Sequence, residues 1–168
     1  MKRSLLTPEG MDIKNKKAPS TLLKPNVRPR ERSFKRSNAT QSILLANLKE
    51  TVLDFINDIE KLFSDPEDQM EIMKVYLYFS NMSDHDLMNH IIAHILPYSD
   101  KIKKRDEAYV LGERSNIFAG FPKSKVEKIV QIVHADPENG GLTREERDAI
   151  WEYFDLMIEI TDQFKKNV

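Results

Sequence analysis

The sequence predicts an all-α protein, and three observations support this fold class. Apolar residues recur at helical spacings of three and four through most of residues 41–168. Capping residues, prolines and glycines divide the same range into segments of helix length. No stretch of any length alternates apolar and polar residues, as a half-buried strand does. We therefore expect a single helical domain of five to six helices around one core.

The first 40 residues differ sharply from the rest in charge. Residues 1–40 hold 11 Lys/Arg and 3 Asp/Glu, a net charge of +8, whereas residues 41–168 hold 15 and 24, a net charge of −9. The first part also contains four prolines and no lasting apolar period, so it cannot bury enough surface to offset the entropy lost on ordering. The sequence predicts a disordered basic arm over residues 1–40 and an acidic all-α domain over residues 41–168.

Two helices are expected in the first half of the domain. From residue 42, one apolar stripe follows spacings of 3, 4, 3, 4 and 3, which predicts an amphipathic helix of about six turns. The stripe consists of Leu45, Leu48, Val52, Phe55, Ile59 and Leu62. Asp65 and Pro66 are typical of a helix start, so a second helix should run to about Asn81. We expect the second helix to bury Met70, Met73, Leu77 and either Phe79 or Tyr76.

Capping patterns predict the remaining helices. Ser83 and Asp86 open a third helix that continues through Leu96. A fourth is expected from Ser99 to Leu111 with Ile102, Tyr109 and Val110 inward, and it is followed by a packed loop carrying Ile117, Phe118 and Phe121. A fifth should span about Pro122 to His134. Thr143 and Glu146 form a capping box for the last helix, about 144–165, whose apolar side chains we expect in the core.

The segment "HADPENGGLTREER", before the last helix, resembles the loop of a calcium-binding EF-hand. With Leu142 at loop position 8, Gly140 falls at position 6 and Glu146 at position 12, as in the motif. Positions 1 and 3, however, are then Ala135 and Pro137, which offer no side-chain oxygen. The pattern therefore favours a capped helix–turn–helix corner over a calcium site.

His90 and His94 are the strongest candidates for metal ligands. Their spacing of four places both imidazoles on one face of a helix, a geometry that can chelate a metal. The residue after His90 is Ile91, where a zinc protease has its catalytic Glu. A small metal-dependent hydrolase using His90 and His94 is thus the alternative to the preferred interpretation, in which the two residues border the core.

Other catalytic chemistry has little support in the sequence. The chain has no Cys, so it has neither a thiolate nucleophile nor a cysteine metal site. Gly140-Gly141 lacks the following Lys and the preceding strand of a phosphate-binding loop. No apolar run approaches the length of a membrane span. We expect a protein that is not an enzyme, has no cofactor and does not enter a membrane.

The densest basic run of the arm is the candidate partner-binding site. Mobile cations of this kind neutralise the phosphates of nucleic acid or contact an acidic protein surface, including that of a second copy in a homo-oligomer. A nuclear-import signal has the same composition. The predicted partner-binding residues are Arg28, Arg30, Arg32, Lys35 and Arg36.

The C-terminal half resembles a module in small helical proteins encoded by large nucleocytoplasmic DNA viruses. The stretches "RDEAYVL", "IFAGFPKSKVEKI" and "LTREERDAIWEYFD", within about residues 90–160, carry the resemblance. It implies a viral origin and a location in the host cytoplasm, the nucleus or the virion. The family carries no assigned catalytic residues, so the resemblance transfers none to this sequence. Together with the charge pattern, it favours a non-enzymatic interaction or structural protein in which a helical scaffold bears a basic arm.

Overall fold

A computed structural model describes residues 37–167, and every regular element in this range is helical. The longer helices are α1 (Ser37–Glu60), α2 (Pro66–Ser80), α3 (Asp84–His94), α7 (Lys123–His134) and α8 (Arg144–Lys166). The shorter ones are α4 (Ser99–Lys103), α5 (Glu107–Gly112) and α6 (Arg114–Ile117), with 3₁₀ turns η3 (Leu96–Tyr98) and η4 (Pro137–Asn139). The predicted all-α fold is confirmed, and the helices outnumber those expected because short ones replace parts predicted as loop or as longer helices.

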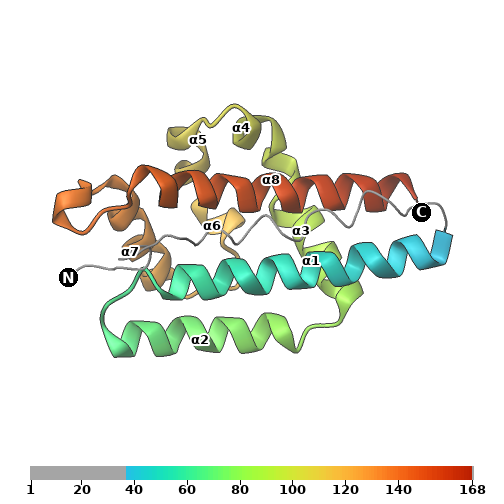
Figure 1. The fold of residues 1–168 in the computed structure, drawn as a ribbon, viewed down its shortest axis with the longest axis horizontal. Helices are drawn as coiled ribbons and strands as arrows, with labels where there is room; N and C mark the ends of the chain where they lie inside the picture. The colour runs from blue at the N-terminus through green and yellow to red at the C-terminus, as the bar shows by residue number, and fades with distance from the viewer. Residues whose placement is uncertain (1–36, 168) are drawn as a thin grey trace.

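The central helix of the bundle is α1, which lies between α2 and α8 and runs opposite to both (Figure 1). The short helices α4 and α5 lie on the side of α8 away from α1 (Figure 1). The predicted stripe of α1 faces the core: Leu48 and Ile59 are almost fully buried, and only Leu62 is partly exposed. Phe55 packs against Tyr153 and Phe154 of α8, with ring centroids 5.3 and 5.4 Å away. The last helix contributes a largely buried apolar side, as predicted.

The predicted helix starts carry the expected caps. The Asp65 carboxylate accepts a hydrogen bond of 3.1 Å from the N–H of Glu67, and the Ser83 hydroxyl accepts one of 3.0 Å from the N–H of Asp86. These bonds satisfy donors that a helix leaves unpaired at its first turn. The first helix, α1, begins at Ser37 and buries Thr40. It therefore starts before residue 42, where the sequence predicted its start.

The predicted fourth helix, Ser99 to Leu111, is wrong as a single element. It breaks at Arg105, whose φ of 56° is left-handed. The N–H groups of Asp106 and Arg105 donate to the carbonyls of Lys101 and Ile102, each at 3.0 Å, which is the double closure of a Schellman motif. The chain restarts as α5 in a new direction, which leaves Tyr109 43% exposed although it was predicted to face inward.

The core side of α2 is also not the predicted one. Met70, Met73 and Leu77 point outward, and Ile72 and Val75 are buried in their place. Phe79, one of the two aromatic residues predicted as alternatives for the core, is buried with them. Both sets have helical spacing, so the sequence contains two apolar stripes on opposite sides of one helix. Gly120 (φ 101°) favours the observed side, because a Cβ there would lie 2.8 Å from the Phe79 ring.

Candidate interaction surfaces

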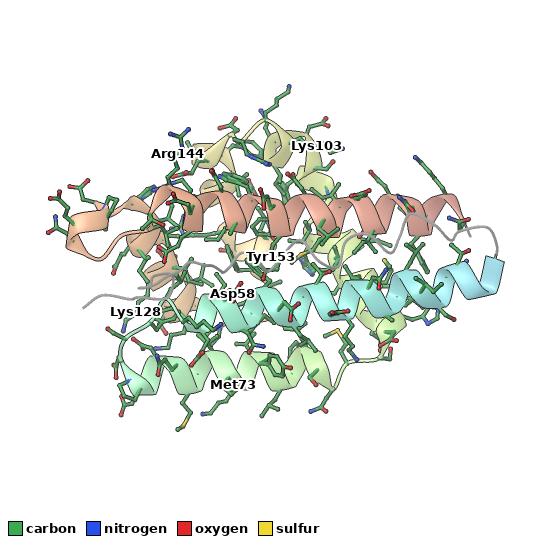
Figure 2. All side chains as sticks on the ribbon, viewed as in Figure 1. Asp58, Met73, Lys103, Lys128, Arg144 and Tyr153 are labelled. Atoms are coloured by element: carbon green, nitrogen blue, oxygen red, sulfur yellow. The ribbon has the colours of Figure 1, made fainter. Side chains whose placement is uncertain are left out.

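The most distinctive surface of the described domain is the outer face of α2, which we define as Met70, Met73 and Leu77. Their exposed fractions are 63%, 39% and 54%. The helix forms the lower edge of the molecule, where Figure 2 labels Met73. Three large apolar side chains at spacings of three and four form a continuous stripe. Stripes of this kind, exposed on a helix, are typical of protein–protein contacts.

A charged anchor from α7 helps to orient α2. Asp68 lies on its inner side, is 5% exposed, and accepts hydrogen bonds from Lys125 at 2.8 Å and Lys128 at 2.6 Å. These two bonds hold the pKa of Asp68 below its ordinary value. Rotating α2 to bury the outer face would bring Asp68 away from both lysines and toward solvent. The ion pairs therefore help to keep the methionines outside.

One flank of the outer face carries separated charges. Glu67 and Glu71 lie on the first half of this flank, and Lys74 and the 55% exposed Tyr78 lie on the second half. The ammonium of Lys74 is 3.4 Å from the Glu71 carboxylate in the same helix. Such exposed pairs contribute little stability, so these groups can exchange partners at small cost.

The rings of His90 and His94 lie next to each other on one side of α3, with centroids 4.5 Å apart and planes tilted by 42°. His90 also packs edge-on against Phe79, at 5.1 Å, and burial followed by repulsion from His94 lowers its pKa. His85 lies elsewhere, near the ring of Phe164. Over residues 37–167, no three His, Cys, Asp or Glu side chains gather closely enough to hold a metal ion. The two imidazoles are thus a pair at the core border, without further protein ligands in this range.

The corner before α8 has the predicted capped-turn geometry. The Asp136 carbonyl accepts hydrogen bonds from Asn139 at 2.9 Å and Gly141 at 2.8 Å. Thr143 and Glu146 form the reciprocal capping box, with bonds of 2.9 and 3.1 Å. A Cβ on Gly141 would collide with the Ala135 carbonyl, which explains the second glycine. The Glu146 carboxylate, proposed as the last calcium ligand of the alternative, is used by the cap.

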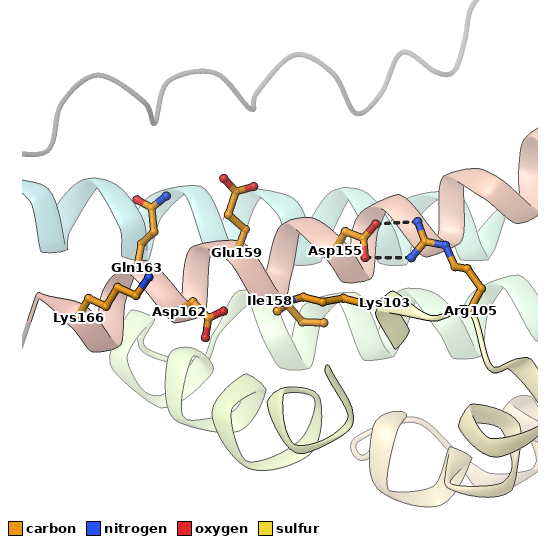
Figure 3. Close-up of a pocket in the computed structure, with 8 residues that line it drawn as sticks. All are labelled: Lys103, Arg105, Asp155, Ile158, Glu159, Asp162, Gln163 and Lys166. Atoms are coloured by element: carbon orange, nitrogen blue, oxygen red, sulfur yellow. Dashed lines mark hydrogen bonds and ion pairs between the residues drawn. The ribbon is translucent and has the colours of Figure 1, made fainter. Parts of the chain in front are cut away.

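A charged groove of about 360 Å³ lies between the end of α4 and the outer side of α8 (Figure 3). Arg105 closes one end through a two-pronged ion pair with Asp155, at 2.7 and 2.9 Å, and lies over the Trp151 ring at 5.3 Å. Lys103, Lys166, Glu159 and Asp162 line the remainder. Cations and anions are equal in number, so the groove favours neither an anionic nor a cationic ligand.

The solvent side of α8 bears a regular acidic stripe. Its carboxylates follow spacings of 3, 4, 3, 4 and 3: Glu145, Asp148, Glu152, Asp155, Glu159 and Asp162. A second acidic group lies on α1, where desolvation and then the neighbouring Glu50 and Asp58 raise the pKa of Asp54 to about 6. Two neighbouring helices, α8 and α1, therefore each carry an acidic group of side chains.

The predicted partner-binding residues Arg28, Arg30, Arg32, Lys35 and Arg36 lie outside the described residues, as does the rest of the basic arm before Ser37. Their role stays a prediction from the sequence. Within residues 37–167, no helix combines the length and apolar character needed to cross a membrane.

Comparison with known protein families, curated proteins and solved structures gives no match to this chain. The candidate surfaces therefore depend on the geometry alone.

Sequence reasoning identified the residues of the outer face of α2 but assigned them to the core. The available signal was the presence of two stripes, one with methionines and one with Ile72, Val75 and Phe79. Choosing between them requires the position of α7, because Lys125 and Lys128 are 57 and 60 residues from Asp68. Helical periodicity does not carry that information.

Proposed function

We propose that the protein is a non-enzymatic interaction protein, in which the helical domain is a scaffold for contacts with other macromolecules. The observation that carries this proposal is the outer face of α2, three large apolar side chains on a helix whose other side is anchored in the core. Isolated exposed apolar residues are ordinary, but a stripe along one helix provides anchors at the spacing used in helix-mediated recognition.

The basic arm supplies the second contact of the proposal. Its net charge of +8 over residues 1–40 suits nucleic acid or an acidic protein surface. We also propose a viral origin, with the host cytoplasm, the nucleus or the virion as the location. This part of the proposal rests on the resemblance carried by residues 90–160. A structural protein of this kind needs contact surfaces and charged groups, but it does not need an active site.

Crosslinking in cells that express the full chain tests the role of the domain. The comparison uses the natural chain, Met73→Glu, and Ile43→Glu as a matched control, because Ile43 and Met73 are both 39% exposed and lie on different helices. We expect Met73→Glu to remove crosslinked species that Ile43→Glu retains. Identical crosslinking patterns for all three chains would contradict a role of the outer face.

Binding to duplex DNA or RNA tests the arm. We expect the full chain to bind any sequence and to lose affinity steeply between about 50 and 200 mM salt, since each neutralised phosphate releases counterions. A chain that starts at residue 37 should lose this binding. Equal binding by the shortened chain would place the nucleic-acid contact on the acidic domain and contradict the proposed role of the arm.

A further inference from the structure

We infer that the outer face of α2 pairs with the same face of a second copy, as an antiparallel homodimer; this inference rests on the proposed interaction function and names its partner. Two-fold dimers are the commonest assemblies of identical chains, and they require a surface that is complementary to itself. The outer face of α2 meets this requirement in its apolar residues and in the charges on its flank.

The apolar residues are arranged evenly about one point. The centre of the stripe lies between Met73 and Lys74, midway between Met70 and Leu77. A two-fold axis through this point, perpendicular to the helix, places Met70 opposite the partner's Leu77 and the two Met73 side chains beside the axis. Methionine and leucine at these spacings interdigitate well, and methionine adapts its shape to an imperfect surface.

The charged flank decides the direction of pairing. In an antiparallel pair the same flank of each helix meets its copy, as it does in antiparallel coiled coils. Lys74 then lies about 3 Å along the axis from the partner's Glu71, because two residues separate their facing positions at about 1.5 Å per residue. The hydroxyl of Tyr78 falls between the partner's Glu67 and Glu71. The acidic half of each helix thus meets the Lys74 half of the other.

A parallel pair lacks this complementarity. It sets the charged flank against the opposite flank, which carries Gln69, Tyr76 and Ser80 and no charge. The acidic stripe of α8 also disfavours other self-contacts, since two such surfaces repel each other. The outer face is small compared with the interfaces of permanent dimers, so the pairing is weak and depends on protein concentration.

Sedimentation velocity of the full chain, from about 1 to 300 µM, tests the inference in the range where weak interfaces associate. We expect a monomer–dimer equilibrium that Met73→Glu weakens about tenfold or more and that Ile43→Glu leaves unchanged. Circular dichroism on each variant checks that the helices remain. A monomer at every concentration, or a dimer equally strong in Met73→Glu, would overturn the inference.

A charge exchange tests the antiparallel geometry directly. Lys74→Glu alone places like charges at the facing 71 and 74 positions, and Glu71→Lys alone does so with the opposite sign, so each variant should dimerise less than the natural chain. An equimolar mixture of the two should restore dimers, because every facing pair is then attractive. No recovery on mixing would overturn the antiparallel pairing. These outcomes are separate from the proposed function, which stands if a monomeric chain still loses crosslinked partners through Met73→Glu.

The basic arm is the other segment that could join two copies, and a chain that starts at residue 37 tests it. If removing the arm abolishes dimers while Met73→Glu does not, the arm makes the contact between copies and the inference is wrong. If the shortened chain dimerises as the full chain does, the outer face of α2 is sufficient.

Discussion

Tyr153 of α8 donates a hydrogen bond of 2.6 Å to the carboxylate of Asp58 on α1, across the contact that joins the two longest helices (Figure 2). The tyrosine is 3% exposed and its ring packs on Phe55. Desolvation, followed by the charge of Asp58, raises its pKa well above the ordinary range. The phenol therefore stays protonated at neutral pH and donates to Asp58, which links α8 to α1.

Replacing Tyr153 with Phe removes this donor and keeps the ring. We expect the free energy of unfolding to fall by about 1–2 kcal/mol, since a bond to a charged acceptor is lost while water can still reach the half-buried Asp58. Urea denaturation measures the effect. In a double-mutant cycle with Asp58→Asn, the free energy of unfolding should fall little when Tyr153→Phe is added to Asp58→Asn. Fully additive losses would show that the two groups do not interact.

Asp54 should make the protein less stable as the pH rises. The folded protein holds its proton more tightly than the unfolded chain, with a pKa of about 6. The unfolded value is about 3.9, so stability is lost between about pH 4 and 6. Asp54→Asn should then be the more stable protein at pH 7, by about 0.5–1 kcal/mol after allowance for solvent screening of a partly exposed carboxylate. At pH 4 the two should melt alike, and an equal difference at both pH values would refute this origin.

Asp68 should act in the opposite direction. Its pKa is lowered in the folded state by the bonds from Lys125 and Lys128, so its contribution is present above the unfolded pKa and disappears as the pH falls through the folded one. At pH 7 we expect Asp68→Asn to cost about 1–3 kcal/mol, because the lysines lose a buried anion but can turn to water. The cost should shrink below about pH 3.5. A cost independent of pH would mean that packing, and not charge, holds α2 on α7.

Arg105 combines a backbone strain with a favourable contact, and two substitutions separate them. Arg105→Gly and Arg105→Ala both lose the ion pair with Asp155 and the contact with Trp151. Only Arg105→Gly relaxes the left-handed turn, whereas Arg105→Ala keeps its strain. We therefore expect Arg105→Ala to be less stable than Arg105→Gly by about 1 kcal/mol, measured by thermal denaturation. The reverse order would show that the turn is not strained.

Much of the fold was predictable because its signals are local. The α1 stripe, the caps at Asp65, Ser83 and Thr143, and the long last helix depend on residues within one or two turns of each other. The break at Arg105 was missed because left-handed turns usually carry glycine, and here an ion pair 50 residues away supports an arginine.

The candidate surfaces depend more strongly on contacts that the sequence does not reveal. Helical periodicity located the outer face of α2 but did not show which of the two apolar stripes faces the core. The ion pairs between Asp68 and the distant α7 determine which stripe is buried. For the histidine pair, spacing predicted that the rings meet, and they do. Whether further metal ligands lie near the two rings depends on the tertiary structure. Among residues 37–167, no group of three possible ligands forms.

The corner between α7 and α8 gives the last prediction. Its stability should not respond to calcium, because the Glu146 carboxylate accepts the N–H of Thr143 at 2.9 Å and serves the helix cap. The melting temperature should be the same in millimolar calcium and in chelator, since a ligand that binds only the folded state must raise it. Thr143→Ala should cost about 0.5–2 kcal/mol under both conditions through loss of the cap oxygen.

Glu146→Gln is the matched control for this corner. Gln keeps an oxygen that can accept the N–H of Thr143, so a capped turn should lose little stability. A calcium loop would instead lose its two-oxygen ligand and with it most of its affinity. A rise in melting temperature with calcium that Glu146→Gln abolishes would therefore replace the capped corner with a divergent calcium site. The absence of such a rise, together with the loss in Thr143→Ala, would agree with a capped corner that does not bind calcium.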